Sequence, residues 1–470
     1  MKKFLLFATM AVMSATSALA ATDKQTYEPV GELKIANQWV LDRVHTPDVF
    51  TKMDVCNTRA RTATLFNDIV YVAHSEARTI VPAPGDTVVA AVIYRFDAKT
   101  GEQLPDLDVT LDGRPYGVFL GVNQIGVDDF GHMWVMPYTS ETATTVKLYQ
   151  LDPETGELTL IQELEKGDDI KRTDFYDLMG DLLREEATCT IMAAGSTEGS
   201  TVYRWFADYQ DDFVGGFRGQ PSLAITDIYP ESVSAWSYGP TVKMVYGDDP
   251  EDYDEYYAGN TFYVDGFNSS PLKYNNKGNL IASFENVETD LLPSEVGANG
   301  CTEFIYDDEL YFAYAYAQYS GLDEKTGKNR ACQVNLVKFG DEGELGEDIQ
   351  FLWQVPADGL GTTSDGGNRV QSICIVPGTD EDGNEELTML TYKSYNGIGV
   401  YKIGYNVKPS EEQPDFKKGD VNGDGEISIA DVTMLVSLVV DQASNERSDV
   451  NGDGETGIAD VTTLVNMLME

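Results

Sequence analysis

The sequence predicts a mainly β fold over most of the chain, followed by a small all-α module at the C-terminus. Three observations support this prediction. Short apolar runs alternate with Gly, Asp and Pro turns through most of the chain, 42% of the 470 residues are hydrophobic, and two segments near the C-terminus are almost identical. Short runs bounded by turn residues are typical of strands, and this apolar content is enough for a large core.

The N-terminus is typical of a secretory signal peptide. Lys2 and Lys3 precede a short apolar run, and residues 18–20 end it with the small-x-small sequence Ala-Leu-Ala. The run is too short to cross ~30 Å of hydrocarbon, and no other stretch approaches the ~18 apolar residues of a membrane span. We therefore expect residues 1–20 to direct export, and the mature protein to be extracellular, cell-surface-associated or periplasmic, without a membrane span.

The chain is strongly acidic. It has 78 Asp and Glu against 33 Lys and Arg, for a formal net charge of −45. Binding to nucleic acid requires clustered Lys and Arg to neutralise phosphates, so we exclude nucleic acid as a partner. Residues 416–470 hold 11 acidic and 3 basic residues, so most of the acidity belongs to the surface of the long N-terminal part.

That long part, residues 21–405, repeats a unit of four strands. The clearest copy has its apolar runs at residues 61–66, 69–73, 90–96 and 104–111. A similar order of strands and acidic turns recurs over residues 123–160 and again over residues 301–339. The turns contain Asp, Pro and Gly, which preset or tolerate the backbone angles that tight turns require.

One such sheet cannot bury both of its faces, and radial stacking of several sheets around an axis solves this problem. At ~50–60 residues per blade, residues 21–405 predict a β-propeller of six or seven blades. We expect an N-terminal strand near residues 37–44 to complete the last blade beside residues 399–403. Tandem β-sandwiches are the alternative, because short strands with turn signals suit both folds.

The five cysteines are odd in number and scattered, and no CxxC pair is present. Export would place them in an oxidising compartment, but their spacing does not resemble a disulfide framework. We expect them to pack as small apolar side chains in the core, with at most one or two disulfides.

Two copies of a twelve-residue loop stand near the C-terminus. Segments 420–440 and 449–469 are identical at 14 of 21 positions. Each loop has oxygen-bearing side chains at positions 1, 3, 5 and 12 and Gly at position 6, as Ca²⁺ loops do. Position 9 is Ser428 in one loop and Gly457 in the other, so we expect the second site to be weaker. The predicted ligands of two calcium ions are Asp420, Asn422, Asp424, Glu426, Ser428, Asp431, Asp449, Asn451, Asp453, Glu455 and Asp460.

An apolar stripe at helical spacing follows each loop. The two stripes are Val432, Leu435, Val436 and Val439, and Val461, Leu464, Val465 and Leu468. Residues 406–418 contain two Pro and a Glu pair and are typical of a solvated linker. Residues 419–470 therefore predict a loop-helix unit that occurs twice.

This arrangement closely resembles a type I dockerin over residues 419–470, about a ninth of the chain. The resemblance implies a module that folds on binding calcium and attaches an exported protein to a cohesin-like protein or surface scaffold, most often for glycan breakdown. In that family, loop positions 10 and 11 often carry Ser/Thr pairs that select the cohesin. This chain departs from that pattern, which leaves open a different receptor or an intramolecular contact. The corresponding partner-binding residues are Ile429, Ala430, Ile458 and Ala459.

Propeller ligands usually bind where loops lead into the innermost strands. The polar candidates at such positions are Arg61, Arg114, Tyr116, Asn123, Gln124, Glu303, Arg369 and Gln371. A glycoside hydrolase needs two carboxylates at a fixed separation, and spacing in sequence selects no pair among so many acids. Two functions follow: a propeller that binds glycan or protein during polysaccharide breakdown, or a docked glycoside hydrolase or polysaccharide lyase.

Overall fold

The computed structural model of the protein has two compact units, a body of residues 20–409 and a C-terminal module within residues 410–470. The predicted signal peptide falls outside the described residues except for Ala20. The structure describes residues 20–23, 25–80, 88–166, 172–195, 201–207, 218–224, 239–245, 261–266, 269–275, 280–283, 300–316, 332–339, 349–363, 370–380, 382–408, 419, 421–422, 427–441, 443–444, 447–451 and 456–469.

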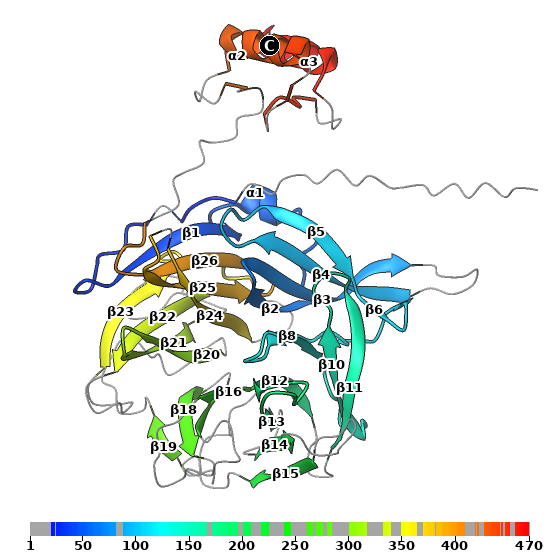
Figure 1. Ribbon diagram of the computed structural model, residues 1–470, viewed down its shortest axis with the longest axis vertical. Helices are drawn as coiled ribbons and strands as arrows, with labels where there is room; N and C mark the ends of the chain where they lie inside the picture. Colours follow the sequence, from blue (N-terminus) through cyan, green and yellow to red (C-terminus); the bar gives the residue numbers. More distant parts are fainter. Residues whose placement is uncertain are drawn as a thin grey trace, which may run out of the picture. The chain divides into compact units, whose positions relative to one another are not determined.

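The body is a β-propeller, as predicted, and its described strands form six sheets, the lower of the two predicted blade numbers (Figure 1). The strands of the first three blades run from the inside outward in chain order. They are β2 (Ala60–Phe66), β3 (Ile69–Ile80), β4 (Val88–Asp97) and β5 (Gln103–Asp108); β8 (Gln124–Val127), β9 (Met133–Met136), β10 (Thr145–Leu151) and β11 (Glu157–Glu165); and β12 (Thr173–Gly180), β13 (Cys189–Gly195), β14 (Thr201–Ala207) and β15 (Arg218–Ala224). A hairpin of β6 (Thr110–Leu111) and β7 (Arg114–Pro115) extends the second blade beyond β11.

The other three blades follow the same plan. Their strands are β16 (Thr241–Val245), β17 (Thr261–Gly266), β18 (Ser269–Asn275) and β19 (Leu280–Ser283); β20 (Cys301–Tyr306), β21 (Glu309–Tyr316), β22 (Gln333–Phe339) and β23 (Ile349–Val355); and β24 (Gln371–Thr379), β25 (Glu385–Lys393) and β26 (Gly397–Gly404) with β1 (Lys34–Asp42). A short helix, α1 (Pro47–Phe50), follows β1.

The N-terminal strand closes the ring of blades. β1 pairs antiparallel with β26, from Lys34 opposite Gly404 to Asp42 opposite Gly397. The fully buried Trp39 of β1 donates a hydrogen bond from Nε1 to the carbonyl oxygen of Ala98, at 2.8 Å, in the first blade. The last blade therefore contains strands from both ends of the body, as the sequence predicted.

Turn residues explain why the strands reverse where they do. Asn67 and Asp68, between β2 and β3, have φ angles of 49° and 58°, the left-handed values that a two-residue hairpin turn requires. Asp97 and Asp152 begin the outer turns, and each accepts backbone amides two and three residues ahead. These side chains stabilise the turns with local hydrogen bonds. The apolar strands on either side can then pair within a blade and pack against the neighbouring blades.

The five cysteines are free in the structure, and Cys189, Cys301 and Cys332 are buried. Burial raises the pKa of Cys189 and of Cys301, which keeps both thiols protonated and unreactive. Among the described residues, no helix is long and apolar enough to span a membrane.

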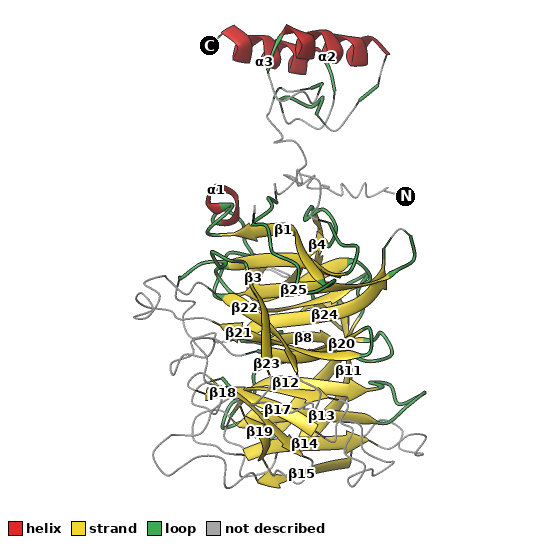
Figure 2. Ribbon diagram, turned by 90° about the vertical axis from the view of Figure 1, so that its left-hand side faces the viewer, coloured by secondary structure: helices red, strands yellow, loops and turns green. Residues whose placement is uncertain are grey.

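The C-terminal module consists of two loop-helix units, as predicted. Helices α2 (Ile429–Asp441) and α3 (Ile458–Met469) pack side by side (Figure 2). Their contact is apolar, because Leu435 and Leu464 are fully buried together with Val421 and Val450 from the loops. Ile427, Val432, Leu438, Val461 and Met467 pack against these four residues, partly buried. Val436 and Leu468 of the predicted apolar stripes are instead exposed, because they lie away from the contact between the helices.

One buried acid gives the propeller a pH-dependent stability. Asp265 of β17 accepts the Gly300 amide at 3.0 Å through Oδ2, and its Oδ1 has no partner among the described residues. Burial raises the pKa of this carboxyl to about 8, although the amides of Gly300 and Gly266 oppose the rise. The folded state therefore holds a proton that the unfolded state releases above about pH 4, so this group's contribution to stability is lost between pH 4 and 8.

Asp265→Asn is expected to raise the free energy of unfolding at pH 8 by several kcal/mol, at about 1.4 kcal/mol for each pKa unit. The neutral amide keeps an acceptor for Gly300 and has no proton to lose. At pH 4 the variant and the parent protein should unfold alike. Denaturant titrations at both pH values test this prediction, and parallel pH profiles of the two proteins would contradict it.

Candidate functional site

The six inner strands β2, β8, β12, β16, β20 and β24 surround the propeller axis (Figure 1). We call the end at which these strands begin the mouth. Loops that precede inner strands reach the mouth, and so do segments that follow the second strand of each blade, because that strand runs antiparallel to the first.

Three of the predicted ligand residues meet at the mouth. Arg61 donates from Nε to Oδ1 of Asn123 at 2.8 Å, and Asn123 donates from Nδ2 to the carbonyl oxygen of Asp174 at 2.5 Å. Gln124 exchanges two hydrogen bonds with the backbone of Tyr176, each of 2.5 Å. The network joins the inner strands of the first three blades and fixes their relative positions.

The other predicted ligand residues lie elsewhere. Glu303 accepts Lys273 Nζ at 2.7 Å and the Tyr263 hydroxyl at 2.5 Å, so its side chain links the fourth and fifth blades. Tyr116 is buried in the apolar core between the first and second blades, and Arg114 is exposed on β7. Arg369 lies outside the described residues. The structure does not bring these residues together with Arg61.

A partly exposed aromatic pair that sequence reasoning did not select also lies at the mouth. Phe119, in the loop before β8, is 56% exposed and makes an edge-to-face contact with Tyr138, with ring centroids 6.4 Å apart. The Arg59 guanidinium lies 5.0 Å from the centre of the Phe119 ring, and that of Arg172 lies 5.0 Å from the centre of the Tyr138 ring. We call these four residues the mouth cluster.

The arginines of the mouth cluster are already paired with carboxylates. Arg59 Nε lies 2.8 Å from Glu76 Oε2, and Arg172 binds both oxygens of Asp174, at 2.9 and 2.6 Å. The mouth cluster therefore combines two aromatic rings with guanidinium groups whose charges are balanced by carboxylates. The sequence signal for it is the apolar run Val118-Phe119-Leu120 between Gly117 and Gly121, in the loop before β8.

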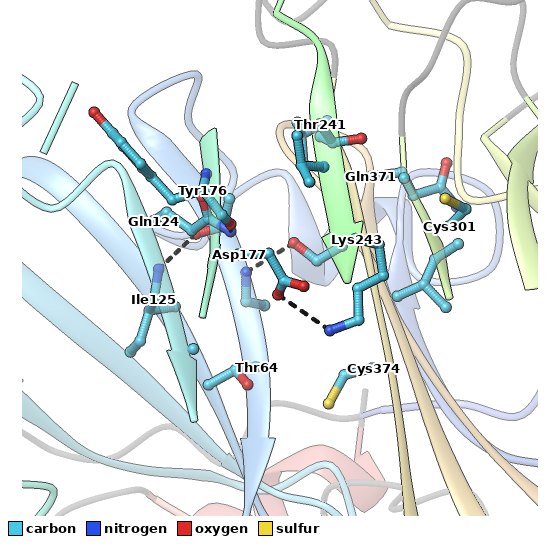
Figure 3. Close-up of a pocket in the computed structure, with 18 of the residues that line it drawn as sticks. Thr64, Gln124, Ile125, Tyr176, Asp177, Thr241, Lys243, Cys301, Gln371 and Cys374 are labelled. Carbon is cyan, nitrogen blue, oxygen red and sulfur yellow. Dashed lines mark hydrogen bonds and ion pairs between the residues drawn. The ribbon is translucent and has the colours of Figure 1, made fainter. Parts of the chain in front are cut away.

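A cavity of about 170 Å³ lies on the propeller axis and is lined by residues from all six inner strands. In Figure 3, Lys243 of β16 and Asp177 of β12 point toward each other across it, and Lys243 Nζ lies 3.1 Å from Asp177 Oδ1. Asp177 Oδ2 also accepts the Met244 amide at 2.6 Å. Gln371, named from the sequence as a candidate, lines this axial cavity too.

Asp128, His132 and Asp181 form a further cluster, with ligand-type atoms within 4.8 Å of one another. Their oxygens are already used by the backbone: Asp128 accepts the amides of Phe130 and His132, and Asp181 accepts those of Leu183, Glu185 and Glu186. The cluster therefore closes two turns at the end of the second and third blades opposite the mouth.

In the C-terminal module, the two loops end in the same geometry. Asp431 Oδ1 accepts the Asn422 amide at 3.0 Å and Oδ2 accepts the Ser428 amide at 2.7 Å. Asp460 repeats this with Asn451 at 2.9 Å and Gly457 at 2.7 Å. Both carboxylates are fully buried. Burial alone would raise the pKa of Asp431, but the amides of Asn422 and Ser428 hold it below its usual value.

The predicted partner positions are exposed in both repeats. Ile429 is 79% exposed and Ile458 is 76% exposed, and Ala430 and Ala459 are exposed beside them. The two repeats therefore present equivalent exposed apolar residues at their helix starts.

A family model described as the dockerin type I domain matches residues 418–469. Residues 418–469 form a type I dockerin domain. Such domains generally bind calcium, and their partners are cohesins. The dockerin of this chain fits calcium, because two buried carboxylates stand at the twelfth loop positions and hard oxygen donors are what this ion requires.

No curated protein matches the chain. Solved structures that match it include a DUF4623 family protein from Bacteroides eggerthii, with 14% identity, a TM-score of 0.49, and coverage of 81% of this chain and 76% of that chain. Another is AofleA from Arthrobotrys oligospora, with 9% identity, a TM-score of 0.38, and coverage of 84% and 92%. A third is an endo-arabinase from Bacteroides thetaiotaomicron, with 14% identity, a TM-score of 0.30, and coverage of 61% and 94%. These likenesses assign no function to the chain.

Proposed function

We propose that this is an exported protein that its dockerin attaches to a cohesin-type partner or cell-surface assembly, and whose propeller binds glycan during polysaccharide breakdown. The observation that carries the proposal is the dockerin at residues 418–469. The signal-peptide pattern of residues 1–20 supports export.

Two calcium ions would bind to the dockerin, one in each loop. In the first loop, Asp431 and Asn422 are held together by the hydrogen bond between them, and Asp460 and Asn451 are held likewise in the second. The remaining proposed ligands are the others predicted from the sequence: Asp420, Asp424, Glu426, Ser428, Asp449, Asp453 and Glu455. Of these, Asp420, Asp424, Glu426, Asp453 and Glu455 lie outside the described residues.

The mouth cluster supports glycan binding by the propeller. The C–H bonds on the faces of a sugar ring carry partial positive charge and are attracted to the negative face of an aromatic ring. Phe119 and Tyr138 offer such faces, and the arginines beside them hold the rings in place through cation–π contacts. The paired carboxylates leave little net charge on this surface, which favours a neutral glycan over a charged one.

Phe119→Ala is expected to weaken binding of the mature protein to its polysaccharide at least about fivefold, because exposed aromatic anchors typically contribute 1 kcal/mol or more. Adsorption to a panel of insoluble polysaccharides and affinity electrophoresis with soluble ones would measure the loss. The matched control is Phe130→Ala, because Phe130 is 44% exposed in the turn at the far end of β8. Equal binding by the two variants would contradict the role of the mouth cluster.

A glycan-active hydrolase or lyase is the second candidate, and one observation favours it. Burial raises the pKa of Asp177 in the axial cavity, against the opposing effect of Lys243, and a raised carboxyl pKa is a property of general acids. Assays for released sugars on the same polysaccharide panel decide between binding and catalysis. Turnover that disappears in Asp177→Asn would replace the binding role with an enzymatic one.

A further inference from the structure

We propose that the axial cavity binds one neutral, hydroxyl-rich unit about the size of a single monosaccharide, such as the terminal sugar of a glycan. The choice of a sugar rests on the glycan-binding role proposed above. The site itself rests on the cavity, on its unpartnered polar atoms and on its charge balance.

Three buried polar atoms around the cavity lack a hydrogen-bond partner among the described residues. They are Gln371 Oε1, Trp134 Nε1 and Thr241 Oγ1. Gln371 is completely buried and Trp134 is 2% exposed. A buried polar atom without a partner costs about 1–3 kcal/mol, so three of them around one cavity indicate that a ligand uses them.

These atoms differ in chemistry. Gln371 Oε1 accepts hydrogen bonds, Trp134 Nε1 donates one, and the Thr241 hydroxyl does both. A hydroxyl group also donates and accepts, so neighbouring hydroxyls of one sugar ring suit such a mixed set. The Trp134 indole lies directly over Gly126 of β8, where an added Cβ would come within 2.3 Å of the ring. Because Gly126 has no side chain, the Trp134 indole can lie against the backbone of β8 and line the axial cavity.

The charge of the cavity favours a neutral ligand. Lys243 and Asp177 form an ion pair 3.1 Å apart, and the Asp177 carboxylate holds the pKa of Lys243 above its usual value although burial lowers it. The positive charge of Lys243 is therefore already neutralised by Asp177. An anion would also have to approach a protein of formal charge −45.

The size of the cavity fits one sugar ring. A volume of about 170 Å³ corresponds to roughly a dozen water-sized positions at 10–15 Å³ each, which is room for one sugar ring and not for a longer oligosaccharide. The Lys243 side chain is 39% exposed, so solvent reaches the lining residues.

Thr241→Val tests the site with little risk to the fold, because valine has nearly the same shape and the hydroxyl that it removes has no described partner. The matched control is Thr190→Val on β13, which removes another buried, unpartnered hydroxyl away from the cavity. Each mature full-length variant is titrated with a panel of methyl glycosides of neutral hexoses and pentoses, and with galacturonate as the anionic counterpart. Calorimetry and ligand-observed NMR measure the affinity.

We expect at least one neutral glycoside to bind the parent protein and Thr190→Val with equal affinity. The same glycoside should bind Thr241→Val about fivefold to tenfold more weakly, because that variant loses one neutral hydrogen bond. No binding by any neutral glycoside, equal binding by both variants, or preference for galacturonate would overturn the inference. If polysaccharide binding depends on Phe119 but no monosaccharide binds, this inference alone is overturned. Monosaccharide binding without polysaccharide binding would overturn the role of the mouth cluster alone.

Discussion

Removal of calcium by a chelator is expected to unfold the dockerin and to leave the propeller folded. The apolar core of the dockerin contains few residues, and the buried Asp431 and Asp460 need a cation to offset their charge. At free calcium a thousandfold above Kd, each ion stabilises the domain by about 4 kcal/mol. Calorimetry should show two unfolding transitions, of which only the one belonging to the dockerin depends on calcium.

Substitutions at the twelfth loop positions separate the two ions. Titration calorimetry should count two ions in the parent protein and one in either Asp431→Ala or Asp460→Ala. The Ser428 hydroxyl donates to Asp431 Oδ2 at 3.3 Å, whereas Gly457 has only its backbone amide to offer Asp460. The ion that remains in Asp431→Ala should therefore be the weaker one. Helical circular dichroism that persists in chelator, or a count other than two, would contradict the calcium proposal.

The double variant Ile429→Asp and Ile458→Asp is expected to weaken binding to a cohesin partner by about 30-fold or more, because buried apolar anchors typically contribute 2 kcal/mol or more to an interface. Both residues are about three-quarters exposed, so the substitutions should not unfold the module. Aspartate at a helix start is also favourable to the helix dipole. Surface plasmon resonance against a panel of immobilised cohesin modules measures the effect.

The single variants reveal whether both repeats can bind. If either copy can face the partner, each single variant should bind within about twofold of the parent protein, because only one of two equivalent orientations is lost. The matched control is Ile305→Asp in the propeller, where Ile305 is 63% exposed. A double variant that binds like this control would exclude Ile429 and Ile458 from the interface.

Much of the propeller could be predicted from short-range chemistry. The turns at Asn67-Asp68 and Asp307-Asp308 have the positive φ angles that these residues tolerate. The strand ends at Phe66 and Ile69 were therefore predicted to the residue, but β3 continues to Ile80, beyond the predicted residue 73. The number of blades was not predicted, because the sequence allowed six or seven, and the described strands form six sheets. Blade number depends on how sheets pack against each other, and local turn signals do not report that packing.

The candidate residues of the propeller were harder to predict. Asn123 and Gln124 do lie at the mouth, but their side chains bond to the third blade. Phe119, Tyr138, Arg59 and Arg172 are distant in sequence, and only the ring of blades brings them together. The direction of a side chain at a strand end depends on the neighbouring blade, which no local pattern specifies.

The sequence by itself determined the dockerin, because loop ligands and helix stripes act within a few residues of one another and repeat in register. It also determined that the long N-terminal part is built from four-stranded units, since turn residues and strand patterns are local. Only the tertiary structure decided where the mouth cluster and the axial cavity lie. Lys243 and Asp177 are 66 residues apart and meet because six inner strands converge on one axis.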